Sequence, residues 1–260
     1  MASPGTLRIE GLTKRFQALT ALEDVDLALE SGEALGLIGP NGSGKTTLFN
    51  LISGVYPPSA GRISFNGNDI TGDPAHRISR RSIGRTFQNL RLFPRMTVYE
   101  NVRAARHAGA PALSQLWVGR AARRVERDAV MDRLAEVGLA DRAEDLAAEL
   151  PLAGQRRLEL ARALAAKPTL LLLDEPAGGM TPAETDHMAE IIATHAMPGR
   201  SVIVVEHKLD MLSRLCNRLC VLNFGRKIAE GTADAVLRNP DVLEAYLGTE
   251  DEQDRHAPVD

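Results

Sequence analysis

Glycines, one lysine and two threonines stand together in a short stretch whose spacing suits the binding of phosphate. The stretch reads GPNGSGKTT and fits the pattern G-x-x-x-x-G-K-[ST]. Glycines there allow positive φ and let backbone N–H groups approach phosphate oxygens without a Cβ in the way. We predict a nucleoside triphosphate site, with Lys45 as a point charge on the β- and γ-phosphates and Thr46 as a hydroxyl ligand of Mg²⁺. The predicted phosphate-binding residues are Gly39, Pro40, Asn41, Gly42, Ser43, Gly44, Lys45, Thr46 and Thr47.

Two carboxylates and a histidine follow two apolar runs farther along the chain. Residues 170–173 are four leucines that lead into Asp174 and Glu175, and the aliphatic residues 202–205 precede His207 by two positions. Continuous apolar runs are typical of strands buried on both faces of a parallel sheet, and ligands bind at the carboxyl ends of such strands. We therefore predict that Asp174 holds Mg²⁺, that Glu175 polarises the attacking water and that His207 reaches the γ-phosphate.

The elements that must position these residues are visible in the apolar pattern. Residues 34–38 read as a buried strand before the phosphate loop, and residues 48–52 belong to an amphipathic helix after it. Residues 7–10, 25–30 and 63–67 alternate apolar and polar, as half-buried antiparallel strands do. We expect these three strands to form a small sheet beside the nucleotide loop.

A helical insertion interrupts this α/β pattern. From about residue 97 to residue 164 the spacing is helical, with Val130, Leu134 and Val137 one turn apart and Gly138 placed to end their helix. The arrangement predicts an α/β fold with a helical insertion.

Composition and charge exclude several classes of protein. The chain has 260 residues, 44% of them hydrophobic and 25% charged, as in ordinary globular proteins. Its net charge of −3 provides no attraction to nucleic acid. The first residues, MASPG, predict no signal peptide, and no apolar run approaches the roughly 18 residues of a membrane span.

The cysteines and a group of arginines are expected to have structural roles. Cys216 and Cys220 lie among leucines, as buried thiols in a reducing compartment do. The arginines around Arg123 and Arg124 are typical of a solvated helix face.

Together, the phosphate loop, Gln88, residues 150–157, the Asp174–Glu175 pair and His207 occur in the order and spacing of an ATP-binding-cassette (ABC) ATPase. The chain resembles that family over about residues 6–248. The resemblance implies that two such domains dimerise head to tail with ATP between them. It also implies that Phe16 stacks on adenine, that Glu175 is the general base and that His207 holds the γ-phosphate. Gln88 would sense Mg²⁺ and the attacking water while linking the site to a membrane partner.

The resemblance also implies a fold and a division of the chain. The fold is a P-loop NTPase (RecA-like) parallel-sheet core with a small antiparallel β-subdomain and a helical insertion subdomain. The division is a single ABC ATPase domain over residues 1–250, with the core and β-subdomain in 1–87 and 160–250, the helical subdomain in about 88–159, and a disordered tail over 251–260.

One stretch departs from the family pattern. The family signature Leu-Ser-Gly-Gly-Gln opens a helix whose N-terminus meets the γ-phosphate on the other subunit. In one register Pro151 stands where that Ser belongs; in another, one residue shorter, Leu152 aligns with the signature leucine and the Gly-Gln pair is kept. The Ser is missing in both, while the backbone N–H groups and the helix dipole remain. We predict contacts to the opposite nucleotide from Ala153, Gly154 and Gln155.

The missing Ser has two explanations. The helix N-terminus alone is sufficient, because the importer subfamily that the chain resembles often varies here. Alternatively, the chain offers a weakened site to its partner and needs a different ATPase subunit for full activity. The resemblance also implies that residues 177–182 form the loop that crosses to the opposite subunit, although Thr181 stands there where the family usually has Asp.

Finer similarities point to one branch of the family. Residues 89–102, the insertion at 104–119, residues 156–162 and the ending at 239–248 look like the ATP-binding subunits of branched-chain amino acid importers. Urea importers and lipopolysaccharide or lipid exporters share several of these features and stay open as alternatives. A soluble ABC ATPase acting on nucleic acid or ribosomes fits less well, because the chain has one cassette and no heptads.

The importer reading implies specific partners. They are a second ABC ATPase subunit (the same chain or another), two transmembrane permease subunits and, indirectly, a solute-binding protein, with no nucleic acid. The chain would lie peripherally on the cytoplasmic face of the cell membrane. Leu92, Phe93 and Met96 would line the permease docking groove, or instead pack the helical subdomain.

Overall fold

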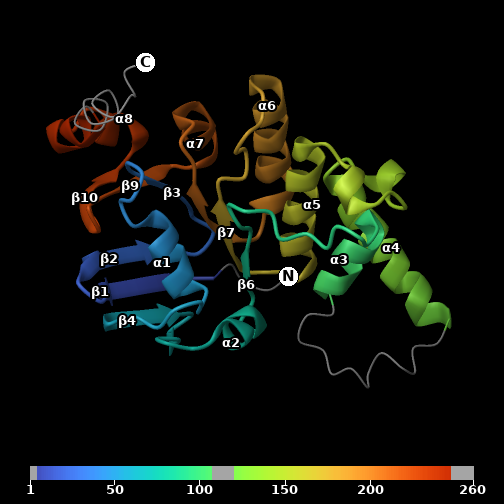
Figure 1. The fold of residues 1–260 in the computed structure, drawn as a ribbon, viewed down its shortest axis with the longest axis horizontal. Helices are drawn as coiled ribbons and strands as arrows, with labels where there is room; N and C mark the ends of the chain where they lie inside the picture. Colours follow the sequence, from blue (N-terminus) through green and yellow to red (C-terminus); the bar gives the residue numbers. More distant parts are fainter. Residues whose placement is uncertain (1–4, 107–119, 247–260) are drawn as a thin grey trace, which may run out of the picture.

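The computed structural model describes residues 5–106 and 120–246, and it contains two sheets (Figure 1). The larger sheet is parallel except for its edge strand β10, which pairs with β9 in the antiparallel sense. Its order is β10 (Arg226–Gly231), β9 (Arg218–Asn223), β3 (Ala34–Ile38), β8 (Ser201–Val205), β7 (Leu170–Asp174) and β6 (Ile83–Arg85). The predicted α/β class is confirmed.

The parallel strands are buried on both faces, as their continuous apolar runs predicted. Along β7, Leu171 and Leu173 pack into the core beneath the helices, whereas Leu170 and Leu172 pack into the core shared with the smaller sheet. The two-residue period of a strand divides one leucine run between two cores. Because β3, β8 and β7 pair in the parallel sense, their carboxyl ends lie along one edge of the sheet.

The smaller sheet is antiparallel, and helix α1 (Lys45–Ile52) lies beside it and shares its core (Figure 1). Its order is β2 (Leu19–Leu29), β1 (Leu7–Phe16), β4 (Ala60–Phe65) and β5 (Asn68–Asp69). Strands β1 and β2 extend well beyond the predicted residues 7–10 and 25–30. The pairing of β1 with β2 shifts register at several points after Ile9, and such bulges break the alternation that reveals a strand in a sequence.

The helical insertion lies at the opposite end of the long axis from the antiparallel sheet (Figure 1). It contains α3 (Val98–Arg106) and α4 (Arg120–Glu136), which pack against α5 (Leu152–Ala165). Val130, Leu134 and Val137 are buried, and Gly138 has φ +64° just after the end of α4, as predicted. Helix α5 continues through the predicted boundary between residues 159 and 160, so the domain limits stay a prediction.

The remaining helices complete the two layers around the sheet. They are α2 (Ala75–Arg80), α6 (Pro182–Ile191), which continues as a π-turn over Ile192–Ala196, α7 (Leu209–Leu215) and α8 (Ala233–Leu237), with 3₁₀ turns at Ala140–Arg142 and Ala147–Glu149. Within the described residues, no helix is long and apolar enough to cross a membrane. Most of the predicted insertion at 104–119 and the predicted tail at 251–260 lie outside the described residues.

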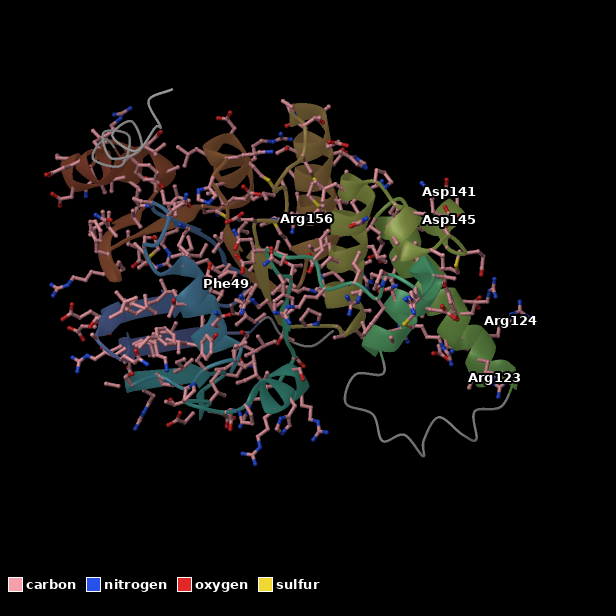
Figure 2. All side chains as sticks on the ribbon, viewed as in Figure 1. Phe49, Arg123, Arg124, Asp141, Asp145 and Arg156 are labelled. Atoms are coloured by element: carbon pink, nitrogen blue, oxygen red, sulfur yellow. The ribbon has the colours of Figure 1, made fainter. Side chains whose placement is uncertain are left out.

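The arginines of α4 and the two cysteines lie where their sequence patterns predicted. Arg123 and Arg124 lie exposed on α4, at the end that points away from the body of the molecule (Figure 2). Cys216 and Cys220 are buried free thiols, and burial raises their pKa values to about 12 and about 11. Both observations confirm the structural roles predicted for these residues.

Candidate nucleotide-binding site

The phosphate loop connects β3 to α1 and has the backbone that its glycines predict. Gly39, Gly42 and Gly44 adopt φ of +146°, +78° and +108°, which L side chains rarely adopt. A Cβ at Gly39 would collide with the carbonyl oxygen of Leu222, whereas a Cβ at Gly42 would meet nothing within 4 Å. The first glycine is thus required by packing as well as by conformation, and the second by conformation alone. The first N–H groups of α1 are left free to bind an anion.

Lys45 is buried at the start of α1, and its ammonium group is held by the loop itself. Its Nζ donates hydrogen bonds to the carbonyl oxygens of Gly39 at 2.7 Å and Pro40 at 2.9 Å. Burial lowers the pKa of Lys45, and the charges of Glu175 and Asp174 oppose that shift. A buried cation whose hydrogen-bond partners are neutral carbonyls is well suited to receive an anionic ligand.

Asp174 ends β7 with a side chain only 1% exposed, and it is held by the neighbouring strand β6. Arg85 Nη2 donates to Asp174 Oδ2 at 2.9 Å, and the backbone N–H of Asp174 donates to Thr86 Oγ1 at 3.0 Å. Burial raises the pKa of Asp174, whereas Arg85 lowers it. The pKa is raised overall, and the ion pair with Arg85 partly offsets the effect of burial and favours the carboxylate form.

The other oxygen of Asp174 is compatible with a metal ligand. Asp174 Oδ1 is buried and has no hydrogen-bond partner among the described residues. Carboxylate oxygens and hydroxyls are the ligands that Mg²⁺ prefers, together with water and phosphate oxygens. An oriented carboxylate with one unused oxygen therefore fits the predicted metal role.

Glu175, Gln88 and His207, the three predicted catalytic residues, meet at one point. Glu175 Oε1 accepts a hydrogen bond from Gln88 Nε2 at 3.0 Å and lies 3.3 Å from His207 Nε2. Glu175 itself has φ +48°, which is uncommon for a residue with a side chain. The structure thus places Gln88 and His207, two side chains far from Glu175 in sequence, on its carboxylate; the catalytic roles of all three stay predictions.

The site also contains residues that the sequence did not identify. Arg85 donates to Asn50 and Ser53 at the far end of α1 as well as to Asp174, so it joins β6, α1 and β7. Glu206, buried beside His207, accepts a hydrogen bond from the backbone N–H of Ala177 at 2.8 Å. The available signal was their position, because a charged residue in or just after a buried strand needs a partner.

Lys208, on the other side of His207, is a further residue that the sequence did not identify. Its Nζ donates to Thr185 Oγ1 at 2.6 Å and to the carbonyl oxygens of Ala177 and Met180. Together with Glu206, it ties the end of β8 to the loop at residues 177–182. Thr181 closes that loop as the N-cap of α6, with a capping box to Glu184.

A cleft of about 470 Å³ joins the predicted phosphate and catalytic residues to an apolar rim. This volume is within the usual range for small-ligand pockets. Phe16, the predicted adenine contact, lies on the rim with 38% of its surface exposed. Its ring packs edge-on against Tyr56 and has Lys14 Nζ 4.9 Å from its centroid. The lining residues are Phe16, Leu19, Thr20, Ala21, Asn41, Gly42, Ser43, Gly44, Lys45, Thr46, Thr47, Gln88, Glu175, His207, Phe224 and Gly225.

The predicted partner-facing stretch lies at the start of α5. Pro151 is its N-cap residue, so the helix begins where the first register places the signature serine. Pro151 and Leu152 are exposed, whereas Gly154 is buried beneath Leu150 and Gln155 Nε2 donates to the Leu150 carbonyl at 2.9 Å. The roles of Ala153, Gly154 and Gln155 toward a second nucleotide therefore stay predictions.

The residues predicted for permease docking divide between two environments. Leu92 is half-buried against the helical core, and Met96 is half-buried nearby. Phe93 is exposed, with the Arg162 guanidinium 5.0 Å from its ring centroid. Of these three residues, only Phe93 is exposed, with 47% of its surface accessible.

Comparisons with known sequences are consistent with this site. A family model described as "ABC transporter" matches residues 22–178, and one described as "Branched-chain amino acid ATP-binding cassette transporter" matches residues 226–252. The chain is 41% identical over 248 residues to the high-affinity branched-chain amino acid transport ATP-binding protein BraF of Pseudomonas aeruginosa, covering 93% of this chain and 97% of that protein. It is 39% identical over 249 residues to LivG of Escherichia coli K12, with the same coverage.

Solved structures give the same picture of the fold. The ADP conformation of MJ1267, an ATP-binding cassette of an ABC transporter, superposes with a TM-score of 0.82 at 30% identity, covering 95% of this chain and all of that one. The dimeric post-hydrolysis state of the cassette MJ0796, bound to ADP and Pi, superposes with a TM-score of 0.76 at 25% identity, covering 87% of this chain and 98% of that one.

Proposed function

The chain belongs to the ABC transporter family of ATP-binding proteins, and we propose that it is the ATP-hydrolysing subunit of an importer for branched-chain or related amino acids. The predicted family, the P-loop NTPase fold and the ATPase class are confirmed. The observation that carries the catalytic part of the proposal is the convergence of Gln88 and His207 on Glu175 beside the buried Lys45.

The loop and Lys45 bind the triphosphate in this proposal. Backbone N–H groups at the start of α1 donate to phosphate oxygens, and the helix dipole adds partial positive charge. Lys45 Nζ exchanges its bonds to the Gly39 and Pro40 carbonyls for charge-assisted bonds to the β- and γ-phosphates. In the free protein the hydrogen-bond partners of this buried cation are neutral, so the exchange gives it anionic partners.

Glu175 is the general base in this proposal. Its carboxylate accepts a proton from a water that attacks the γ-phosphorus, while the bond to the bridging oxygen of ADP breaks. Gln88 and His207 both lie against Glu175 Oε1, so they are placed to orient that water and hold the transferred phosphoryl group. Thr46 and Asp174 Oδ1, with Gln88 nearby, would hold Mg²⁺, which when bound neutralises charge on the phosphate oxygens.

A second cassette and two permeases complete the proposed assembly. The exposed start of α5 would face the γ-phosphate bound by the other cassette, and the loop at 177–182 would cross the same interface. Phe93 would contact a permease that lies in the membrane, and the chain would work peripherally on its cytoplasmic face. A solute-binding protein would deliver the solute to the permeases.

The substrate class rests on the chain's similarity to branched-chain amino acid transport proteins. BraF and LivG match nearly the full length of the chain, and the branched-chain family model matches its C-terminal end. The cargo would meet the permeases and the binding protein, so no residue of this chain is assigned to it.

Uptake by proteoliposomes tests the proposal. The chain is co-expressed with the permeases and the second cassette of its own gene cluster, and radiolabelled leucine is offered with the cognate binding protein. We expect ATP-dependent uptake that is lost in the Glu175→Gln variant. ATP-dependent transport of urea alone, export of lipid, or no association with permeases would contradict the assigned import function.

A further inference from the structure

Phe224, in the turn between β9 and β10, is unfavourable in two respects: its apolar side chain is exposed and its backbone has a positive φ. It is 83% exposed, more than any other large apolar side chain in the described part of the molecule. Its φ of +43° lies in the left-handed region, where Gly, Asn and Asp are usual and a bulky residue is an outlier. A two-residue hairpin turn requires positive φ at this position, so the fold explains the conformation but not the choice of an exposed Phe, and strained residues of this kind cluster at binding sites.

The turn is fixed, so this conformation is imposed by its neighbours. The N–H of Gly225 donates to the Ser43 carbonyl in the phosphate loop at 3.0 Å, and the Gly225 carbonyl accepts from the N–H of Glu23 at 2.9 Å. Arg226 pairs with Glu23 at 2.9 Å. A Cβ at Gly225 would lie 2.7 Å from the Ala21 carbonyl oxygen, so β2 packs tightly under the turn. The adjacent Phe224 is consequently held beside the phosphate loop.

Phe224 lines the same cleft as the phosphate loop, and with the exposed Phe16 and Leu19 it forms the apolar rim of that cleft. The part of a nucleotide that extends from the phosphates to this rim is its base. Phe16 already contacts Lys14 and Tyr56, so part of its ring surface is used. Phe224 offers the larger accessible aromatic surface.

We propose that Phe224 is an aromatic contact for the base of the bound nucleotide, forming the rim of the cleft together with Phe16. The proposal rests on the proposed function only in that the cleft binds ATP. Stacking of a base on an aromatic ring is favourable and would cover the apolar surface that Phe224 exposes in the free protein. The proposal therefore explains why this turn has Phe where Asn or Gly would suit the backbone better.

Isothermal titration of the full chain with two probes separates base from phosphate binding. ATPγS carries both parts, whereas inorganic tripolyphosphate carries only the phosphates. For Phe224→Ala we expect about tenfold weaker ATPγS binding, the size of one base-stacking contact, and unchanged tripolyphosphate binding. Phe224→Asn should weaken ATPγS binding similarly and raise the melting temperature, because Asn tolerates the left-handed conformation. Val125→Ala, 68% exposed on α4, is the matched control and should change neither affinity.

The other outcomes overturn the proposal. Equal loss of both affinities in Phe224→Ala would mean that the turn supports the phosphate loop and does not contact the base. Unchanged ATPγS affinity, with weaker association of two chains by light scattering, would make Phe224 an interface residue. If the wild-type chain binds neither probe, the proposed ATP site itself is wrong. This result is distinct from a failure of the Phe224 proposal, which would appear only when the variants are compared with a wild-type chain that binds.

Discussion

Two helices of this molecule begin at positions where phosphate binding is expected, and they are built differently. Helix α1 follows a glycine loop with three positive φ values and starts with a buried lysine. Helix α5 follows Pro151, which has no N–H, and it exposes Leu152 in its first turn. The start of α1 thus adds a charge and a hydroxyl to its backbone donors, whereas the start of α5 has backbone donors and a dipole only.

The difference indicates which contribution each helix can make. Charge-assisted bonds are roughly twice as strong as neutral ones, so α1 alone can determine ATP affinity. A helix terminus without side-chain donors contributes less, and its effect falls off within the first turn. We therefore expect changes at α1 to affect binding and changes at α5 to affect hydrolysis.

The largest expected effect comes from Glu175→Gln, which removes the proposed base and keeps α1 intact. Turnover should fall about 10²- to 10⁴-fold, the usual contribution of a general base. ATP affinity measured by fluorescence titration should stay within about threefold of wild type, well below the tenfold change of a lost contact. Turnover close to wild type would remove Glu175 from this role.

Lys45→Met tests the charge at the start of α1. ATP affinity should fall about 100-fold, because two charge-assisted contacts are lost. The melting temperature of the free protein should not fall, because burial already disfavours the lysine charge and lowers its pKa. Lys45→Arg is the matched control, because it keeps the positive charge and replaces the compact ammonium by a planar guanidinium. Full ATP affinity in Lys45→Met would contradict the assignment of the loop.

Pro151→Ser tests whether α5 lacks a useful hydroxyl. A restored bond to a phosphate is worth about 1.5 kcal/mol or more, so hydrolysis should rise by about tenfold. Pro151→Ala removes the proline ring without adding the hydroxyl and should leave the rate near wild type. Equal rates for Ser and Ala would favour the explanation that the helix terminus alone is sufficient. Melting curves report the gain in helix capping separately.

The smallest effect on hydrolysis is expected from Phe93→Glu, which lies at neither helix start. Basal ATP hydrolysis should be unchanged, while ATP-driven uptake in proteoliposomes falls because the proposed permease contact is lost. Loss of hydrolysis and uptake together would show that Phe93 serves packing of the helical region.

The sequence predicted the half of the site that is built from local pattern. The phosphate loop and its flanking elements lie within a few residues of one another, so their chemistry and spacing were readable. Asp174, Glu175 and His207 were readable because each follows an apolar strand. The limits of β2 were not predicted, because bulges shift its pairing with β1 and interrupt the apolar alternation.

Side-chain partners that are distant in sequence could not be predicted from the sequence pattern. The Arg85–Asp174 pair joins residues 89 positions apart, and nothing near either residue identifies the other. Lys208 binds the loop before α6 through tertiary contacts that depend on how β8 and α6 pack. Phe224 is recognisable only once its φ and its exposure are known. Each of these residues acts through a geometry that the folded chain alone provides.

ATPase turnover per chain, measured against chain concentration, tests most directly whether one cassette holds only half of a working site. Turnover should rise with concentration, or on addition of the second cassette, because in the proposed assembly α5 of another subunit reaches the γ-phosphate. The Glu175→Gln chain at the same concentrations gives the background rate. Equal turnover per chain at every concentration, with or without the second cassette, would contradict the account.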